Sequence, residues 1–198
     1  MQMSAARNTA ASSRFSVDRL GMVIALIVIF SLLLQPFALL RPNRVAATAP
    51  VQVLDALPLP QALLLIGLML ITVGLLVVRY PLKLRLCALV ATLLAVAIAV
   101  GLSARYLTPE GNNYARVSPG GTVWLITFAL ALAIGDTLVR MRLPPLSRLV
   151  ALLLFVALLG LLLYSGVWND ISILKEYASR RDACTSALRT HALLAVGS

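Results

Sequence analysis

The stretch that decides the fold is residues 146–164, which read LSRLVALLLFVALLGLLLY. Arg148 is its one charged residue, and its length is close to the roughly 20 mostly apolar residues that a helix needs to cross a bilayer. Because a bilayer core offers no water to backbone amides, such a run satisfies its own hydrogen bonds by becoming helical. The stretch therefore predicts a membrane-spanning helix.

Four further stretches of the 198-residue chain have the same character: 20–40, 59–78, 84–102 and 122–139. The chain is 61% hydrophobic and 12% charged, with a mean hydropathy of +0.96. Soluble domains are about 45–50% apolar and about 25% charged, so a soluble enzyme is excluded. The runs lack the alternating polarity of a membrane barrel. We predict an all-α integral membrane protein, a bundle of about five transmembrane helices plus an external amphipathic helix.

The first predicted span is interpreted as a retained anchor. Its apolar run exceeds the usual 7–15 residues of a signal peptide, and Gln35-Pro36-Phe37 is a poor cleavage site. The small residues 46–49 leave cleavage open as an alternative.

Basic residues predict the orientation, because cytoplasmic flanks of spans are enriched in Lys and Arg. One side receives nine: Arg7, Arg14, Arg19, Arg79, Lys83, Arg85, Arg140, Arg142 and Arg148. The opposite loops receive four: Arg41, Arg44, Arg105 and Arg116. We therefore expect a membrane protein with a cytoplasmic N-terminus and, after five spans, a C-terminus on the far side of the membrane.

The predicted organisation has four parts. Residues 1–19 form a cytoplasmic tail and 20–165 the five-span membrane region. Residues 166–190 follow, where apolar positions recur every three or four residues over 171–188, which predicts an external amphipathic helix capped by Asn169 or Asp170. Residues 191–198 turn apolar again and are interpreted as the start of a truncated further span.

Aromatic residues cluster at the predicted external ends of the spans. Trp124, Tyr164 and Trp168 lie there. Aromatic faces attract quaternary ammonium groups, so these three residues are candidate substrate-side groups. The alternative is the interfacial belt of Trp and Tyr that membrane proteins share, and we favour the belt.

Asp136 is the one acidic residue inside a predicted span. It lies one turn from the predicted cytoplasmic end, with Arg140 four residues on, so we favour an ion pair over a proton or substrate relay. Gly67, Gly74, Gly101 and Gly160 are predicted to let neighbouring helices approach closely.

The sequence offers no chemistry-bearing motif. The acidic residues are scattered singly, and Cys87, Cys184 and His191 have no metal-ligand spacing. We therefore predict no catalytic residue, no metal site and no cofactor. The arginines are dispersed between spans rather than gathered on one face, which argues against nucleic-acid binding. The expected environment is the lipid bilayer.

One segment resembles a known family. Residues 162–178, LLYSGVWNDISILKEYA, resemble a part of bacterial ABC-importer permeases of the glycine betaine and choline osmoprotectant type that carry an extra N-terminal membrane region. Residues 113–116, 120–124 with Asp136, and 180–182 before 187–188 and His191 are similar to the same proteins.

The resemblance implies a component of a binding-protein-dependent importer for osmoprotectants such as glycine betaine, without catalysis of its own. It also implies a multi-pass protein of the bacterial inner membrane, with a periplasmic C-terminus. A separate ATP-binding subunit and an external substrate-binding protein would be its partners. The family's transport core begins near the position of His191, so the chain resembles the accessory extension. It is expected to be a fragment, a truncated frame or a stand-alone version. The alternative function is a membrane scaffold or assembly protein without transport activity.

Overall fold

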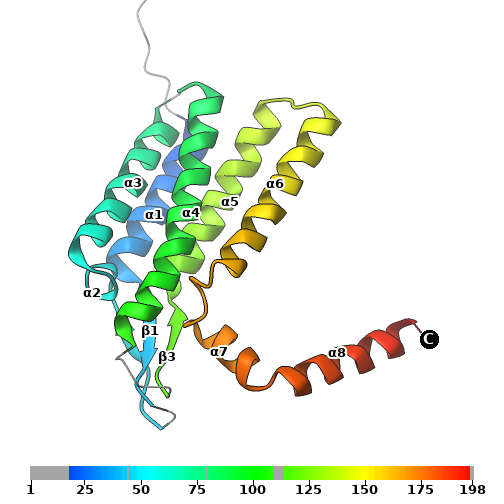
Figure 1. Cartoon of the computed structure of the whole chain (residues 1–198). Helices are drawn as coiled ribbons and strands as arrows, with labels where there is room; N and C mark the ends of the chain where they lie inside the picture. The colour runs from blue at the N-terminus through cyan, green and yellow to red at the C-terminus, as the bar shows by residue number, and fades with distance from the viewer. Residues whose placement is uncertain (1–17, 44, 79, 109–113, 197–198) are drawn as a thin grey trace, which may run out of the picture.

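Five apolar helices run side by side as the main body of the molecule (Figure 1). The computed structural model describes residues 18–43, 45–78, 80–108 and 114–196, so the predicted tail up to residue 17 and the basic residues Arg44 and Arg79 lie outside the description. The helices are α1 (Arg19–Leu34), α3 (Leu59–Val77), α4 (Leu82–Leu107), α5 (Gly121–Arg140) and α6 (Pro145–Tyr164). By length and composition, α3, α4, α5 and α6 are able to cross a membrane, and α1 is a shorter apolar helix.

The first predicted span is shorter than expected. The prediction ran to residue 40, but α1 ends at Leu34, and Gln35 is extended with φ −110° and ψ 144°. Pro36 follows, and a proline disfavours the helical conformation of the residue before it. The other four predicted spans are confirmed as helices to within a few residues.

The predicted bundle of apolar helices is confirmed, and a small sheet that the sequence analysis did not predict is added to it. Strands β1 (Ala38–Arg41), β2 (Ala49–Val51) and β3 (Arg116–Pro119) form an antiparallel sheet in the order β2-β1-β3. The first predicted span contributes most of β1, and the segments between predicted spans contribute β2, β3 and the single-turn helix α2 (Val53–Ala56). The sheet covers one end of the bundle (Figure 1).

The core lies between four of the helices. Helix α1 packs against α3 and α5, and α4 packs against the same two helices. Large side chains at this centre are almost fully buried, among them Ile24, Met69, Leu89 and Ile126. Helix α6 differs, because Leu162 is its one buried residue. In Figure 1 it runs alongside α5 at the edge of the bundle.

The tail is two helices where one was predicted over 171–188. Helix α7 covers Ser172–Ser179 and α8 covers Arg181–Val196, with a break at Arg180, whose ψ is 27°. The N-cap position is Ile171, which has no capping side chain, rather than Asn169 or Asp170. Residues 191–196, predicted to start a new span, continue α8, which leads away from the bundle (Figure 1).

The glycines predicted to allow close helix packing behave differently from one another. A Cβ atom at Gly101 would collide with the backbone and side chain of Val167, so this prediction is confirmed. Gly67, Gly74 and Gly160 have open space where a Cβ would stand, so for them the prediction is wrong. Gly21, which the sequence did not single out, is the glycine at which α1 meets the carbonyl of Leu76.

Candidate functional site

The strongest polar feature of the bundle is a cluster of four charges at the end opposite the sheet. It begins with Asp18, which precedes α1 and is 3% exposed. Its backbone N–H donates to Val77 O at 3.0 Å, and its Oδ1 accepts from the N–H of Leu20 at 3.2 Å. Asp18 therefore caps α1 and ties its start to the end of α3.

Arg85 joins this carboxylate to a second one. It lies in the first turn of α4, is 2% exposed, and places Nη1 2.7 Å from Asp18 Oδ2 and Nη2 3.2 Å from Asp136 Oδ2. Arg140 bridges the same two acids from α5, with Nη1 3.0 Å from Asp18 Oδ2 and Nε 2.8 Å from Asp136 Oδ2. Two acids and two bases thus alternate, and the cluster (Asp18, Arg85, Asp136 and Arg140) is neutral.

The electrostatics of Asp18 follow from these contacts. Burial by itself raises the pKa of a carboxyl group, but the Arg85 hydrogen bond and the charges of Arg140 and Arg85 outweigh burial and hold the pKa of Asp18 below its usual value. Asp18 is therefore ionised at neutral pH. Arg85 Nε is buried and has no hydrogen-bond partner among the described residues.

The sequence predicted half of this cluster. The Asp136–Arg140 ion pair is confirmed, as an i,i+4 contact on α5. Asp18 and Arg85 were missed, because they are 67 residues apart and meet only when the starts of α1 and α4 are brought to the same end of the bundle. The sequence signals for these two residues were an acidic residue before one apolar run and an arginine at the start of another.

The opposite end is closed by backbone contacts. Phe37 N–H donates to Val51 O, and Gly120 N–H donates to Phe37 O, at 2.9 and 2.8 Å. The Thr122 hydroxyl, at the start of α5, lies 2.6 Å from Gln35 O and donates to this carbonyl at the end of α1. The bond from Thr122 satisfies a carbonyl group that the end of α1 otherwise leaves free.

The three candidate aromatic residues have different surroundings. Trp168 is half-buried, and its ring N–H donates to Ala97 O on α4 at 2.8 Å. Trp124 is 62% exposed on α5, and Tyr164 is 91% exposed at the end of α6. Trp168 thus holds the segment after α6 against α4, while the other two rings face outward. Their role toward a substrate stays a prediction.

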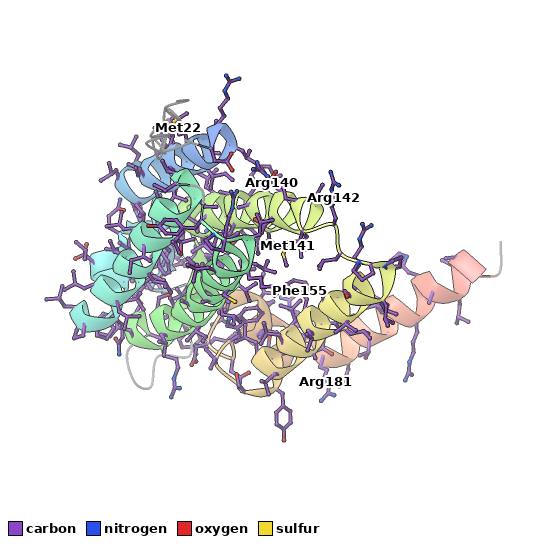
Figure 2. The ribbon with its side chains drawn as sticks, turned by 90° about the horizontal axis from the view of Figure 1, so that it is seen from above. Met22, Arg140, Met141, Arg142, Phe155 and Arg181 are labelled. Carbon is purple, nitrogen blue, oxygen red and sulfur yellow. The ribbon has the colours of Figure 1, made fainter. Side chains whose placement is uncertain are left out.

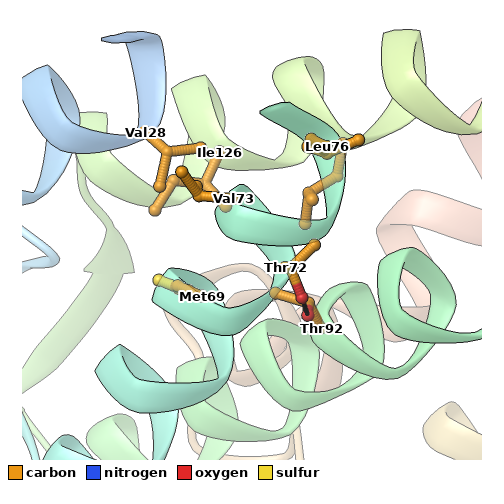
Figure 3. A pocket seen from close by; sticks show the side chains of 8 residues that line it. Val28, Met69, Thr72, Val73, Leu76, Thr92 and Ile126 are labelled. Atoms are coloured by element: carbon orange, nitrogen blue, oxygen red, sulfur yellow. Dashed lines mark hydrogen bonds between the residues drawn. The ribbon is translucent and has the colours of Figure 1, made fainter. Parts of the chain in front are cut away.

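The interior of the bundle contains a small apolar cavity (Figure 3). Val28, Met69, Leu76 and Ile126 contribute to its lining, and the Thr72 and Thr92 hydroxyls are hydrogen bonded to each other at 2.6 Å beside it. Its space suits about one water molecule, but its exposed lining is apolar. Over the described residues, no group of three His, Cys, Asp or Glu side chains is placed to hold a metal ion.

Comparison with known proteins gives one match. Residues 18–174 match the family described as "ABC transporter permease YehY, N-terminal domain". No curated protein and no solved structure matches the chain. The matched range begins at Asp18, contains the whole four-charge cluster and the sheet, and extends into α7.

Proposed function

The chain belongs to the family of the YehY permease N-terminal domain, and from that membership we propose that it is the N-terminal membrane module of an importer for osmoprotectants such as glycine betaine. It is a multi-pass membrane protein of an ABC transporter, a class whose permease domains are typically non-catalytic. The family match over residues 18–174 carries the proposal. The substrate class rests on the sequence resemblance of residues 162–178.

The module is proposed to brace the transport core rather than to conduct substrate. Its centre is filled by apolar side chains, and the neutral four-charge cluster locks α1, α4 and α5 together at one end. Helices α3 and α4 are joined by residues 78–81, and α5 and α6 by residues 141–144. Such turns are too short for a helix that would dock on an ATPase, so coupling to ATP hydrolysis is assigned to the core.

The partners proposed for the assembled transporter are an ATP-binding subunit and an external substrate-binding protein. The proposed orientation places the four-charge end and the N-terminus in the cytoplasm and the sheet in the periplasm. The excess of basic residues at the four-charge end supports this orientation, since such residues are retained on the cytoplasmic side.

The outward-facing aromatic residues belong to the same proposal. Trp124 and Tyr164 lie at the ends of α5 and α6 nearer the sheet, where an interfacial belt is expected. We assign them to this belt. The alternative is a site for the quaternary ammonium group of the substrate. Uptake measurements on a Trp124→Ala variant distinguish the two assignments.

The test is uptake of radiolabelled glycine betaine by a bacterial strain without its own betaine importers. The strain expresses an osmoprotectant permease core, an ATP-binding subunit and a binding protein, with or without this chain, or the chain with the two soluble partners alone. We expect the chain to co-purify with the core and to raise accumulation above that of the core set, and to import nothing without the core.

Two results would change the proposal. Accumulation by the chain with the soluble partners alone would make its own helices the pathway. Association with the core but no change in uptake of betaine would favour the scaffold function, and absence of association would remove the importer proposal altogether.

A further inference from the structure

The end of the bundle that holds the four-charge cluster has more basic residues than those that pair with acids in the cluster. The described residues 18–22, 76–78, 80–86 and 136–149 contain six basic and two acidic side chains. Both acids, Asp18 and Asp136, are engaged by Arg85 and Arg140. Four cations therefore remain without an acidic partner among the described residues: Arg19, Lys83, Arg142 and Arg148.

These four cations, which we call the basic rim, are exposed and lie at or next to the ends of α1, α4, α5 and α6. Arg19 adjoins Asp18, Lys83 is two residues from Arg85, and Arg142 is two residues from Arg140. Arg148 lies in the first turn of α6 and donates its Nε–H to Leu143 O, which leaves its two terminal nitrogens toward the surface. Figure 2 shows Arg140 and Arg142 together at the end of α5.

Arg142 has a backbone conformation in which glycine is favoured over arginine. Its φ is +48°, and it is the one non-glycine residue with positive φ in the described chain. It directly follows the C-cap Met141, a position where helices commonly place glycine because a Cβ is disfavoured there. An arginine at this position therefore lowers the conformational stability of the turn after α5, which indicates that its side chain has a function.

The ends of membrane-crossing helices lie at the depth of the lipid headgroups. Arginine pairs with phosphate groups through several parallel N–H donors, and basic residues next to a span attract anionic lipids. We propose that the basic rim binds the headgroups of anionic phospholipids, with Arg142 as a principal contact. The charge of the rim, unbalanced by the described acids, is complementary to these headgroups, and the neutral cluster behind it holds the rim in place.

The sheet end provides the contrast. Three basic residues near that end, Arg105, Lys175 and Arg180, are each within 4 Å of an acidic side chain, Asp170 or Glu176. These three exposed or partly exposed cations thus have acidic partners on the surface, whereas the four cations of the basic rim have none among the described residues.

Titration of the purified full chain in detergent with phosphatidylglycerol or phosphatidylcholine tests the proposal. Bound lipids are counted by native mass spectrometry, and the apparent unfolding temperature is recorded. We expect preferential binding of phosphatidylglycerol that weakens at high salt, and about a fivefold loss of affinity for each rim cation removed. Inorganic phosphate at millimolar concentration is expected not to displace the lipid.

Arg142→Gly separates lipid binding from structure. Without lipid it should unfold at a higher temperature than the wild type, because glycine tolerates the positive φ, yet it should bind phosphatidylglycerol about fivefold more weakly. Arg142→Gln should lose the same binding without the gain in stability. Arg41→Gln, which removes an exposed arginine from the sheet end, is the matched control and should leave the affinity unchanged.

Equal affinity for the two lipids would overturn the proposal. So would unchanged phosphatidylglycerol binding by both Arg142 variants, or an equal loss in Arg41→Gln. Displacement by inorganic phosphate would reassign the rim to a soluble anion.

Discussion

At one end of the bundle α1, α4 and α5 are joined by side-chain charges, and at the other end the chain is joined by backbone hydrogen bonds of a three-stranded sheet. Asp18 and Arg85 are buried, so these two charges depend on their partners for solvation. The backbone bonds hold whatever the side chains are, provided that the strands stay in register. The two ends should therefore respond very differently to single substitutions.

The largest effect is expected at the four-charge end. Replacing Arg85 by alanine leaves Asp18 and Asp136 without their shared buried partner, and breaking a buried ion pair from one side costs about 3–5 kcal/mol. Thermal unfolding in detergent should show a large fall in the transition temperature, and a cysteine at the Ile24 position should become reactive as α1 separates. The double variant Asp18→Asn with Arg85→Met should be less destabilised than Arg85→Ala. Equal losses in the two variants would contradict pairing as the cause.

A smaller loss is expected where the sheet end uses close packing. Gly101→Ala places a methyl group against Val167, and overpacking of this kind costs about 1–3 kcal/mol. Fluorescence of Trp168 in a Trp124→Phe background should report the loosening, because its ring donates to Ala97 on the same helix. The matched control is Gly67→Ala, which meets open space and should be neutral or stabilising by up to about 1 kcal/mol.

Acid should weaken the four-charge end through its buried carboxylate. The pKa of Asp18 is lower in the folded chain than its usual value of about 3.9, so the ionised group stabilises the fold above that value, and this stabilisation is lost as pH falls through the lowered pKa. Stability measured from pH 6 down to pH 2 should therefore decline below about pH 4. In Asp18→Asn this part of the decline should disappear, and its persistence would assign the effect to other carboxyl groups.

The smallest effect is expected for an exposed ion pair at the sheet end. Arg105 Nε and Asp170 Oδ2 are 3.9 Å apart, and the Arg105 side chain is 66% exposed. Exposed pairs contribute about 0–1 kcal/mol, so Arg105→Gln should change the unfolding free energy by no more than about 0.5 kcal/mol. Removal of an arginine is thus expected to cause the largest loss of stability at the four-charge end and the smallest at the sheet end. A loss comparable with that of Arg85→Ala would end the distinction between them.

Sequence reasoning located the spans because the requirement that produces them is local. An apolar run in lipid forms its backbone hydrogen bonds within itself, so α3, α4, α5 and α6 are visible in composition alone. The Asp136–Arg140 pair was visible for a similar reason, since residues four apart share one face of a helix. The early end of α1 was also within reach, because Pro36 restricts Gln35.

The sequence by itself thus determined the membrane class and the helices, through hydrogen bonds and periodicities that act within a few residues. The tertiary structure alone decided which glycine is in close contact, where β1 meets β3, and that Asp18 and Arg85 complete a neutral cluster. Each of these depends on two segments far apart in the chain meeting at a given depth and rotation. That relation is set by the packing of whole helices, because apolar surfaces in contact fix the register in which the few polar groups must find partners.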